Sequence, residues 1–133
     1  MVFKEETFLL SNTTKGKLPR LPFAIVKDDI LGKSYTLSVA VVSKKQAEHL
    51  NALYRNKDYT PNILSFPLTK NSGEIILHLP TLKKQHKDFA MTLNEYILYI
   101  YIHGCIHLLG YEHGKKMTDL EKKYLEKYTQ HKK

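Results

Sequence analysis

Runs of apolar residues predict four β-strands in this chain. The clearest is residues 35–42, which is rich in β-branched side chains. Its alternate residues Leu37, Val39 and Val41 share one face, and its opposite face is apolar as well. A strand that is apolar on both faces is typical of the centre of a covered sheet. The other predicted strands are residues 7–10, 63–68 and 74–79, with the last two joined as a hairpin.

Apolar residues at helical spacing predict helices around these strands. Ser43 followed by Gln46 is a capping-box pattern, and it begins a helix that ends near Arg55. We expect its buried stripe to be Ala47, Leu50, Leu53 and Tyr54. Two shorter helices are predicted, one from Pro22 to Gly32 and a last one capped by Thr118 and Glu121, while residues 81–91 are expected to be a loop or short helix.

The longest apolar run, residues 93–109, predicts the central helix of the fold. Thr92 and Glu95 form a capping box before it. A helix that is apolar nearly all round is buried inside its domain. We therefore expect one α/β (α+β) domain over residues 1–133, with a small mixed sheet of about four strands and helices packed on it. The metal ligands described below lie on the long buried helix and on the loop after it.

The charge of the chain bears on its partners. The formal net charge is +8 and the pI is about 9.5, which favours a polyanionic partner such as nucleic acid. Many basic proteins bind no polyanion, so the net charge supports nucleic-acid binding only when another motif points to the same function.

Cysteine use and hydropathy indicate the compartment. The single Cys105 excludes an internal disulfide framework and fits a reducing cytoplasm. It lies about 200° round a helix from His103, so we expect its thiol in the core rather than on a metal. The acidic Glu5 and Glu6 near the start argue against an export signal. Polar residues interrupt the run 93–109, which falls short of the roughly 20 apolar residues of a membrane span.

Three of the seven histidines cluster at the end of the central helix. His103 and His107 are one turn apart, which puts their Cβ atoms about 5–6 Å apart on one face. Gly110 can adopt a left-handed backbone, end the helix and return His113 to the same point. Three neutral imidazoles with one position open to water or substrate are the ligand set of a catalytic zinc ion. We therefore predict one zinc ion bound by His103, His107 and His113.

The spacing also matches the metzincin protease pattern H-E-x-x-H-x-x-G-x-x-H at every position but one. Where those proteases have their glutamate base, this chain has Gly104, which cannot accept a proton. We expect Gly104 instead to let a ligand backbone approach the metal closely. The remaining histidines have no such partners and are expected to be ordinary surface or strand residues: His49, His78, His86 and His131.

Two blocks of sequence resemble a known family. The block H-G-x-x-H-L-x-G-Y-x-H at residues 103–113 resembles the signature of the YbeY family of bacterial endoribonucleases, which process ribosomal RNA. Residues 55–67, R-N-K-D-Y-T-P-N-I-L-S-F-P, are similar to that family's R-x-K-D-x-P-T-D-V-L-S-F-P, and residues 73–76 to its G-D-I-x strand opening. Pro61-Asn62 replaces the family's Thr-Asp, which removes a carboxylate, and Glu112 replaces its usual Asp.

The resemblance implies a zinc-dependent, single-strand-specific endoribonuclease in ribosomal RNA maturation and ribosome quality control. It implies that the partners are ribosomal RNA and the small ribosomal subunit, in the cytoplasm, with neither DNA nor a membrane involved. In such a reaction zinc polarises a phosphoryl oxygen and lowers the pKa of its bound water toward about 7.

The resemblance also makes three residues catalytic candidates. Arg55, otherwise a solvated charge at a helix end, would hold a phosphate bidentately. Ser65 faces away from Leu64 and Phe66, so it would line the substrate groove or be a buried, hydrogen-bonded hydroxyl. Glu112 would orient a ligand imidazole or act as a base, or it would be an exposed carboxylate in a turn.

Two other functions fit the same residues. Another zinc hydrolase such as a protease is opposed by Gly104, and turnover of peptides would favour it. A non-enzymatic, ribosome-associated RNA-binding factor with a structural metal predicts that metal loss unfolds the protein. It also predicts that Arg55→Ala keeps full function in cells.

Overall fold

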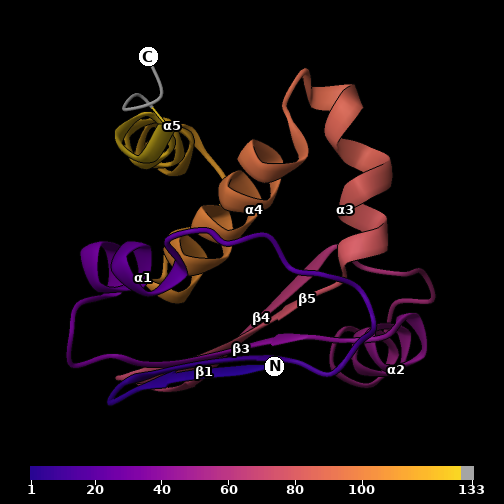
Figure 1. The fold of residues 1–133 in the computed structure, drawn as a ribbon. Helices are drawn as coiled ribbons and strands as arrows, with labels where there is room; N and C mark the ends of the chain where they lie inside the picture. Colours follow the sequence, from indigo (N-terminus) through magenta and orange to yellow (C-terminus); the bar gives the residue numbers. More distant parts are fainter. Residues whose placement is uncertain (130–133) are drawn as a thin grey trace.

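The computed structural model describes residues 1–129, so His131, Lys132 and Lys133 lie outside the described residues. Its strands and helices are interspersed along the first two thirds of the chain, and the rest is helical (Figure 1). The elements are β1 (Val2–Glu5), β2 (Phe8–Asn12), α1 (Phe23–Leu31), β3 (Thr36–Val41), α2 (Lys44–Arg55), β4 (Ile63–Thr69), β5 (Ser72–Leu77), α3 (Leu79–Gln85), the 3₁₀ helix η1 (His86–Phe89), α4 (Leu93–Leu108) and α5 (Lys115–Thr129). The predicted α/β class is confirmed.

The described strands form one mixed sheet in the order β1-β2-β3-β5-β4. β2, β3 and β5 run parallel, and the edge strands β1 and β4 are antiparallel to their neighbours. The prediction of about four strands missed β1. All four residues of β1 are exposed, and the strand is held by backbone pairing to β2, so no buried face marks it in the sequence.

The sheet has a large core on one face and a small one on the other. α1, α4 and α5 stack over the first face (Figure 1). There Leu37, Val39 and Val41 of β3 are buried in the large core, and they share one face as predicted. On the opposite face Val42, Leu64, Ile76 and Ala47 of α2 form a separate cluster. β3 is therefore covered on both sides, which is why it reads as apolar throughout.

The prediction that the buried stripe of α2 includes Leu53 and Tyr54 is wrong. Leu53 and Tyr54 are 61% and 64% exposed. Asn51 is buried instead, one turn after Ala47, and its side-chain amide donates to the carbonyl of Tyr59 at 2.9 Å. The helix is rolled so that the Ala47–Asn51 line faces the protein. Hydrophobicity alone does not reveal this, because the partner of the amide N–H lies in a loop later in the chain.

α4 follows the prediction closely, whereas α5 does not. Thr92 and Glu95 form the expected capping box of α4, whose side chains are buried nearly all round. The proposed caps of the last helix, Thr118 and Glu121, are wrong because α5 already begins at Lys115. Glu121 lies in mid-helix and is only 6% exposed. None of the helices described is long and apolar enough to cross a membrane.

Candidate metal centre

Two short-range features bring the three predicted ligands together. His103 and His107 lie in the last turns of α4, one turn apart. Gly110 then adopts φ +100°, the left-handed backbone that the sequence predicts, and its N–H donates to the carbonyl of His107 at 2.9 Å. The chain turns back there, and His113 joins the pair from the following loop.

The three imidazoles surround one point. Their ring centroids are 4.7 Å apart for His103 and His107, 5.1 Å for His107 and His113, and 5.4 Å for His103 and His113. One nitrogen from each ring lies within 4.8 Å of the other two. His103 and His107 are partly buried and His113 is exposed, so the cluster opens to solvent on one side. No fourth described His, Cys, Asp or Glu joins the cluster.

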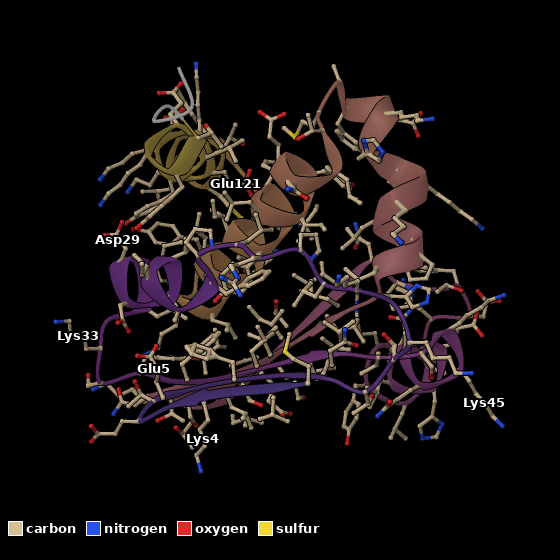
Figure 2. The ribbon with its side chains drawn as sticks, in the orientation of Figure 1. Lys4, Glu5, Asp29, Lys33, Lys45 and Glu121 are labelled. Carbon is tan, nitrogen blue, oxygen red and sulfur yellow. The ribbon has the colours of Figure 1, made fainter. Side chains whose placement is uncertain are left out.

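The carboxylate of Glu121 contacts the first predicted ligand, His103. Nδ1 of His103 is hydrogen-bonded to Glu121 of α5, whose other oxygen lies 3.5 Å from the hydroxyl of Tyr99. Figure 2 shows Glu121 on the side of α5 that faces α4. A carboxylate on Nδ1 fixes the tautomer and leaves Nε2 free to bind a metal. An orienting contact of this kind was one of the three roles considered for Glu112.

Glu121 was missed, although the sequence does carry a signal for it. It is one turn after Met117, and these two are the buried residues of α5. An acidic residue on an otherwise apolar helix stripe needs a partner, since burying an unpaired carboxylate is costly. Glu112, in contrast, is exposed, and within residues 1–129 no hydrogen bond joins it to a ligand imidazole. Its catalytic role remains a prediction.

Burial sets the protonation state of the middle ligand. It lowers the pKa of His107 below the ordinary value, and the charges of His103 and His113 lower it further. The backbone of Tyr111 and the carboxylate of Glu121 act in the opposite direction but more weakly. A His with a lowered pKa is neutral at pH 7, and the neutral imidazole is the form that binds a metal.

The cluster lines a pocket of about 430 Å³ together with two of the three predicted catalytic candidates, Arg55 and Ser65, whereas Glu112 is not among the lining residues. Arg55 reaches it from the end of α2 and Ser65 from β4. Ser65 faces α4, and its Oγ lies 3.5 Å from the carbonyl of Gly104. No acidic residue is among the described residues that line the pocket. The lining is Arg55, Asn62, Ile63, Leu64, Ser65, Pro67, His103, His107, Leu108 and His113.

Asn62, which stands where the family's Asp is expected, has a structural contact. Its side-chain amide donates to Oε1 of Gln85 at 3.0 Å, and the same oxygen accepts from the hydroxyl of Tyr96 at 3.0 Å. These bonds tie the segment before β4 to the end of α3 and the start of α4. The amide thus fixes one wall of the pocket.

Gly104 serves helix packing rather than the approach of a ligand. A Cβ there would lie 2.7 Å from Cδ1 of Ile63 and 3.0 Å from Oγ of Ser65. The expectation that a ligand backbone comes close at this point is therefore wrong, because β4 already occupies the space. The absent side chain lets α4 press against β4, which sets the distance between the histidines and Ser65.

A buried helix with two imidazoles, a third from the next loop and an open side defines a candidate metallohydrolase. The family model described as "Endoribonuclease YbeY" matches residues 10–130. The chain therefore belongs to the YbeY family.

Proteins named "Endoribonuclease YbeY" from three bacteria illustrate the relationship. The chain is 33% identical over 100 residues to that of Polynucleobacter asymbioticus, covering 68% of this chain and 64% of the relative. It is 32% identical over 106 residues to that of a Sulfurihydrogenibium species, covering 70% of each. With that of Francisella philomiragia it shares 31% over 115 residues, covering 78% and 71%. The match thus spans about two thirds of the relatives' length.

A solved structure shares the fold. The solution structure of TM1509 from Thermotoga maritima superposes with a TM-score of 0.65 at 25% identity. The match covers 93% of this chain and 90% of that one. The mixed α/β fold described above is therefore found in a protein with only a quarter of its residues in common.

Proposed function

We propose that this chain is a zinc-dependent endoribonuclease that cuts single-stranded segments of ribosomal RNA during ribosome maturation and quality control. The observation that carries the proposal is the convergence of three imidazole nitrogens in a pocket that also presents a guanidinium, that of Arg55. The names of the relatives support the activity. Ribosomal RNA on the small subunit, in the cytoplasm, is the proposed substrate and place.

The donor set fits zinc. Imidazole nitrogens suit this ion, and a structural site would have a fourth protein ligand, which the described cluster does not have. When bound, zinc supplies a Lewis acid that polarises a phosphoryl oxygen and activates water near neutral pH. Glu121 keeps His103 in the tautomer that such binding needs.

The other residues of the pocket act on the phosphate. Arg55 is exposed, and within the described residues it forms no ion pair, so its guanidinium is available for bidentate contact with a phosphodiester. Such a contact positions the group and offsets the charge that grows on it. Ser65 adds a hydroxyl to the same wall. The lack of an acidic lining residue suits a polyanion and gives a peptidase no base.

Cleavage of ribosomal RNA precursors by purified, zinc-loaded protein tests this function. We expect His103→Ala and His113→Ala to abolish cleavage, and His49→Ala, an exposed histidine on α2, to keep it. RNA fragments should be resolved on gels, with metal content measured on the same samples. Cleavage that survives both ligand variants would mean a contaminating nuclease, and no cleavage by the zinc-loaded wild type would refute the proposal.

A further inference from the structure

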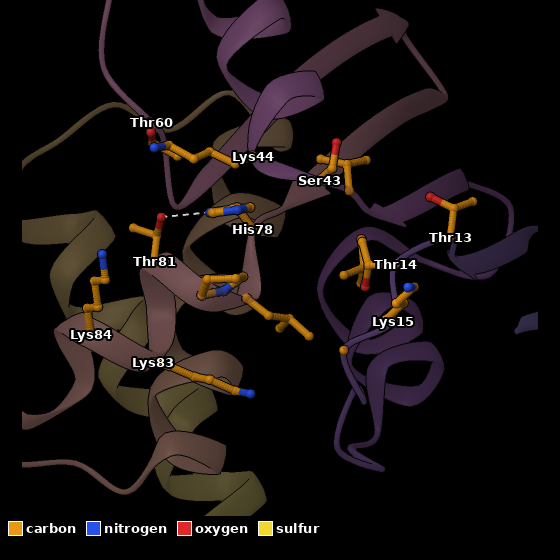
Figure 3. Close-up of a pocket in the computed structure, with 15 residues that line it drawn as sticks. Thr13, Thr14, Lys15, Ser43, Lys44, Thr60, His78, Thr81, Lys83 and Lys84 are labelled. Atoms are coloured by element: carbon orange, nitrogen blue, oxygen red, sulfur yellow. Dashed lines mark hydrogen bonds between the residues drawn. The ribbon is translucent and has the colours of Figure 1, made fainter.

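A second pocket, of about 700 Å³, lies at the carboxyl ends of the parallel strands (Figure 3). It is bounded by the turn after β2, the start of α2 and the start of α3. In open α/β sheets this edge is where ligands bind most often. We call it the lysine pocket. Its lining is Thr13, Thr14, Lys15, Gly16, Val41, Val42, Ser43, Lys44, Thr60, His78, Leu79, Pro80, Thr81, Lys83 and Lys84.

The charge of this lining is entirely positive. Lys15, Lys44, Lys83 and Lys84 come from three separate segments, and no acidic residue is among the described lining residues. Within residues 1–129, none of these four ammonium groups belongs to an ion pair. Hydroxyl groups of five Thr and Ser side chains lie between them. Two of these hydroxyls already donate within the protein, Thr14 to Asn12 and Thr60 to the carboxylate of Glu48. The unpaired ammonium groups around this concave surface are therefore the groups that would bind an anion with several oxygens.

The position of Lys44 is unfavourable for the helix that carries it. It is the first residue of α2, whose first turn has no acidic residue and whose N-cap is Ser43. The N-terminus of a helix carries positive partial charge, so a lysine there is repelled. Helix stability therefore does not explain this lysine, whereas an anion bound at the helix start would be attracted by both.

His78 lies within reach of the charges of two lining lysines and of Glu48. It is buried, and its Nδ1 is hydrogen-bonded to Oγ1 of Thr81 at 2.7 Å (Figure 3). Burial is the main cause of the lowered pKa of His78. The negative charge of Glu48 raises this pKa, and the positive charges of Lys44 and Lys84 lower it. Lysines from α2 and α3 thus contribute to the potential at the same side chain, which is neutral at pH 7.

The lysine pocket and the metal pocket share a wall. Thr60 lines the first and Asn62 lines the second, so their Cα atoms are at most about 7 Å apart along the chain. The backbone N–H of His78 also donates to the carbonyl of Asn62 at 3.1 Å. Residues 60–62 are therefore the segment at which the two linings come closest along the chain.

We propose that the lysine pocket binds backbone phosphates of the RNA strand whose scissile bond lies in the metal pocket. This inference rests on the proposed function. Lysines contact phosphates as point charges without reading bases, so the contact would be independent of sequence. It would hold the strand across residues 60–62 and position the bond beside the three histidines.

Binding of a labelled 2′-O-methyl oligouridine, which keeps the phosphate backbone and resists cleavage, tests the inference. The pocket variant is Lys44→Gln with Lys84→Gln. The control, Lys4→Gln with Lys45→Gln, removes the same charge at two exposed lysines that lie outside the pocket lining (Figure 2). We expect the pocket variant to bind about tenfold more weakly, with a salt slope reduced by about 1.4 for two lost phosphate contacts, and the control to bind like wild type.

The outcomes separate this inference from the proposed function. Equal binding by the two double variants would overturn the inference even if the wild type cleaves RNA. Pyrophosphate binding that is lost in the pocket variant, with oligouridine binding unchanged, would also overturn it in favour of a small phosphorylated ligand. Selective loss of oligouridine binding, together with RNA cleavage by the zinc-loaded wild type, supports the inference. The same loss without any cleavage would mean that the lysine pocket binds RNA phosphates but positions no scissile bond, so the nuclease proposal would fail and the positioning role with it.

Discussion

The metal pocket and the lysine pocket lie side by side but are built in opposite ways. The metal pocket uses two partly buried imidazoles on the last turns of α4 and an exposed one from the next loop, with a buried carboxylate hydrogen-bonded to His103. The lysine pocket uses exposed, unpaired ammonium groups on flexible stems. A small ion needs donors fixed to within a fraction of an ångström, whereas a phosphate chain needs only charge nearby. Firmly positioned side chains are therefore expected where the reaction takes place, and mobile charged side chains where the RNA backbone is only held.

Removing the carboxylate behind His103 should have the largest effect. We expect Glu121→Gln to weaken zinc binding about 10- to 100-fold, because the amide no longer holds Nδ1–H in place as well as a carboxylate does. Competition with a chromophoric chelator measures the affinity. Glu126→Gln, at an exposed position of the same helix, is the control. Equal affinities for both variants would show that Glu121 does not orient the ligand.

The packing behind the metal pocket gives the next effect. Gly104→Ala would place a Cβ 2.7 Å from Cδ1 of Ile63, so we expect a loss of about 1–3 kcal/mol in unfolding free energy. Gly16→Ala in the lysine pocket meets only Thr14 Oγ1 at 3.6 Å and should leave stability unchanged. Urea unfolding compares the two. A Gly104→Ala protein as stable as wild type would mean that the contact between α4 and β4 is not tight.

The smallest effect concerns pH and the lysine pocket. Because burial lowers the pKa of His78 in the folded protein, the unfolded chain binds a proton there that the folded chain rejects. This contribution to stability is present above about pH 6.5, the unfolded value, and is lost as the pH falls toward the lowered folded pKa. Urea midpoints of metal-free wild type should fall between pH 7.5 and 5.5, and fall less for His78→Gln. Parallel curves would contradict this.

Local patterns predicted α4 and its ligands, because every signal lies within a few residues. The capping box at Thr92, the spacing of His103 and His107, and the turn at Gly110 are all set by neighbours in the chain. The fold class followed for the same reason, from alternating strands and helices. Arg55 and Ser65 came from the resemblance to the family, and the structure places both in the metal pocket.

Features that depend on tertiary packing were not predicted. Glu121 meets His103 only because α5 packs on α4, 18 residues later in the chain. The exposure of Leu53 and Tyr54 depends on the rotation of α2 about its axis. That rotation is fixed by the hydrogen bond from Asn51 to a loop later in the chain. The lysine pocket gathers side chains from the turn after β2, α2 and α3, none of which carries a motif by itself.

X-ray absorption at the zinc edge of the metal-loaded protein tests the central claim most directly. We predict one zinc ion per chain with three imidazole nitrogens at about 2.0–2.1 Å and at least one further oxygen, and no sulfur. We also expect His107→Ala to remove the nitrogen signal and the ion. A sulfur ligand from Cys105, a fourth protein ligand that closes the site, or zinc retained by the His107 variant would contradict it.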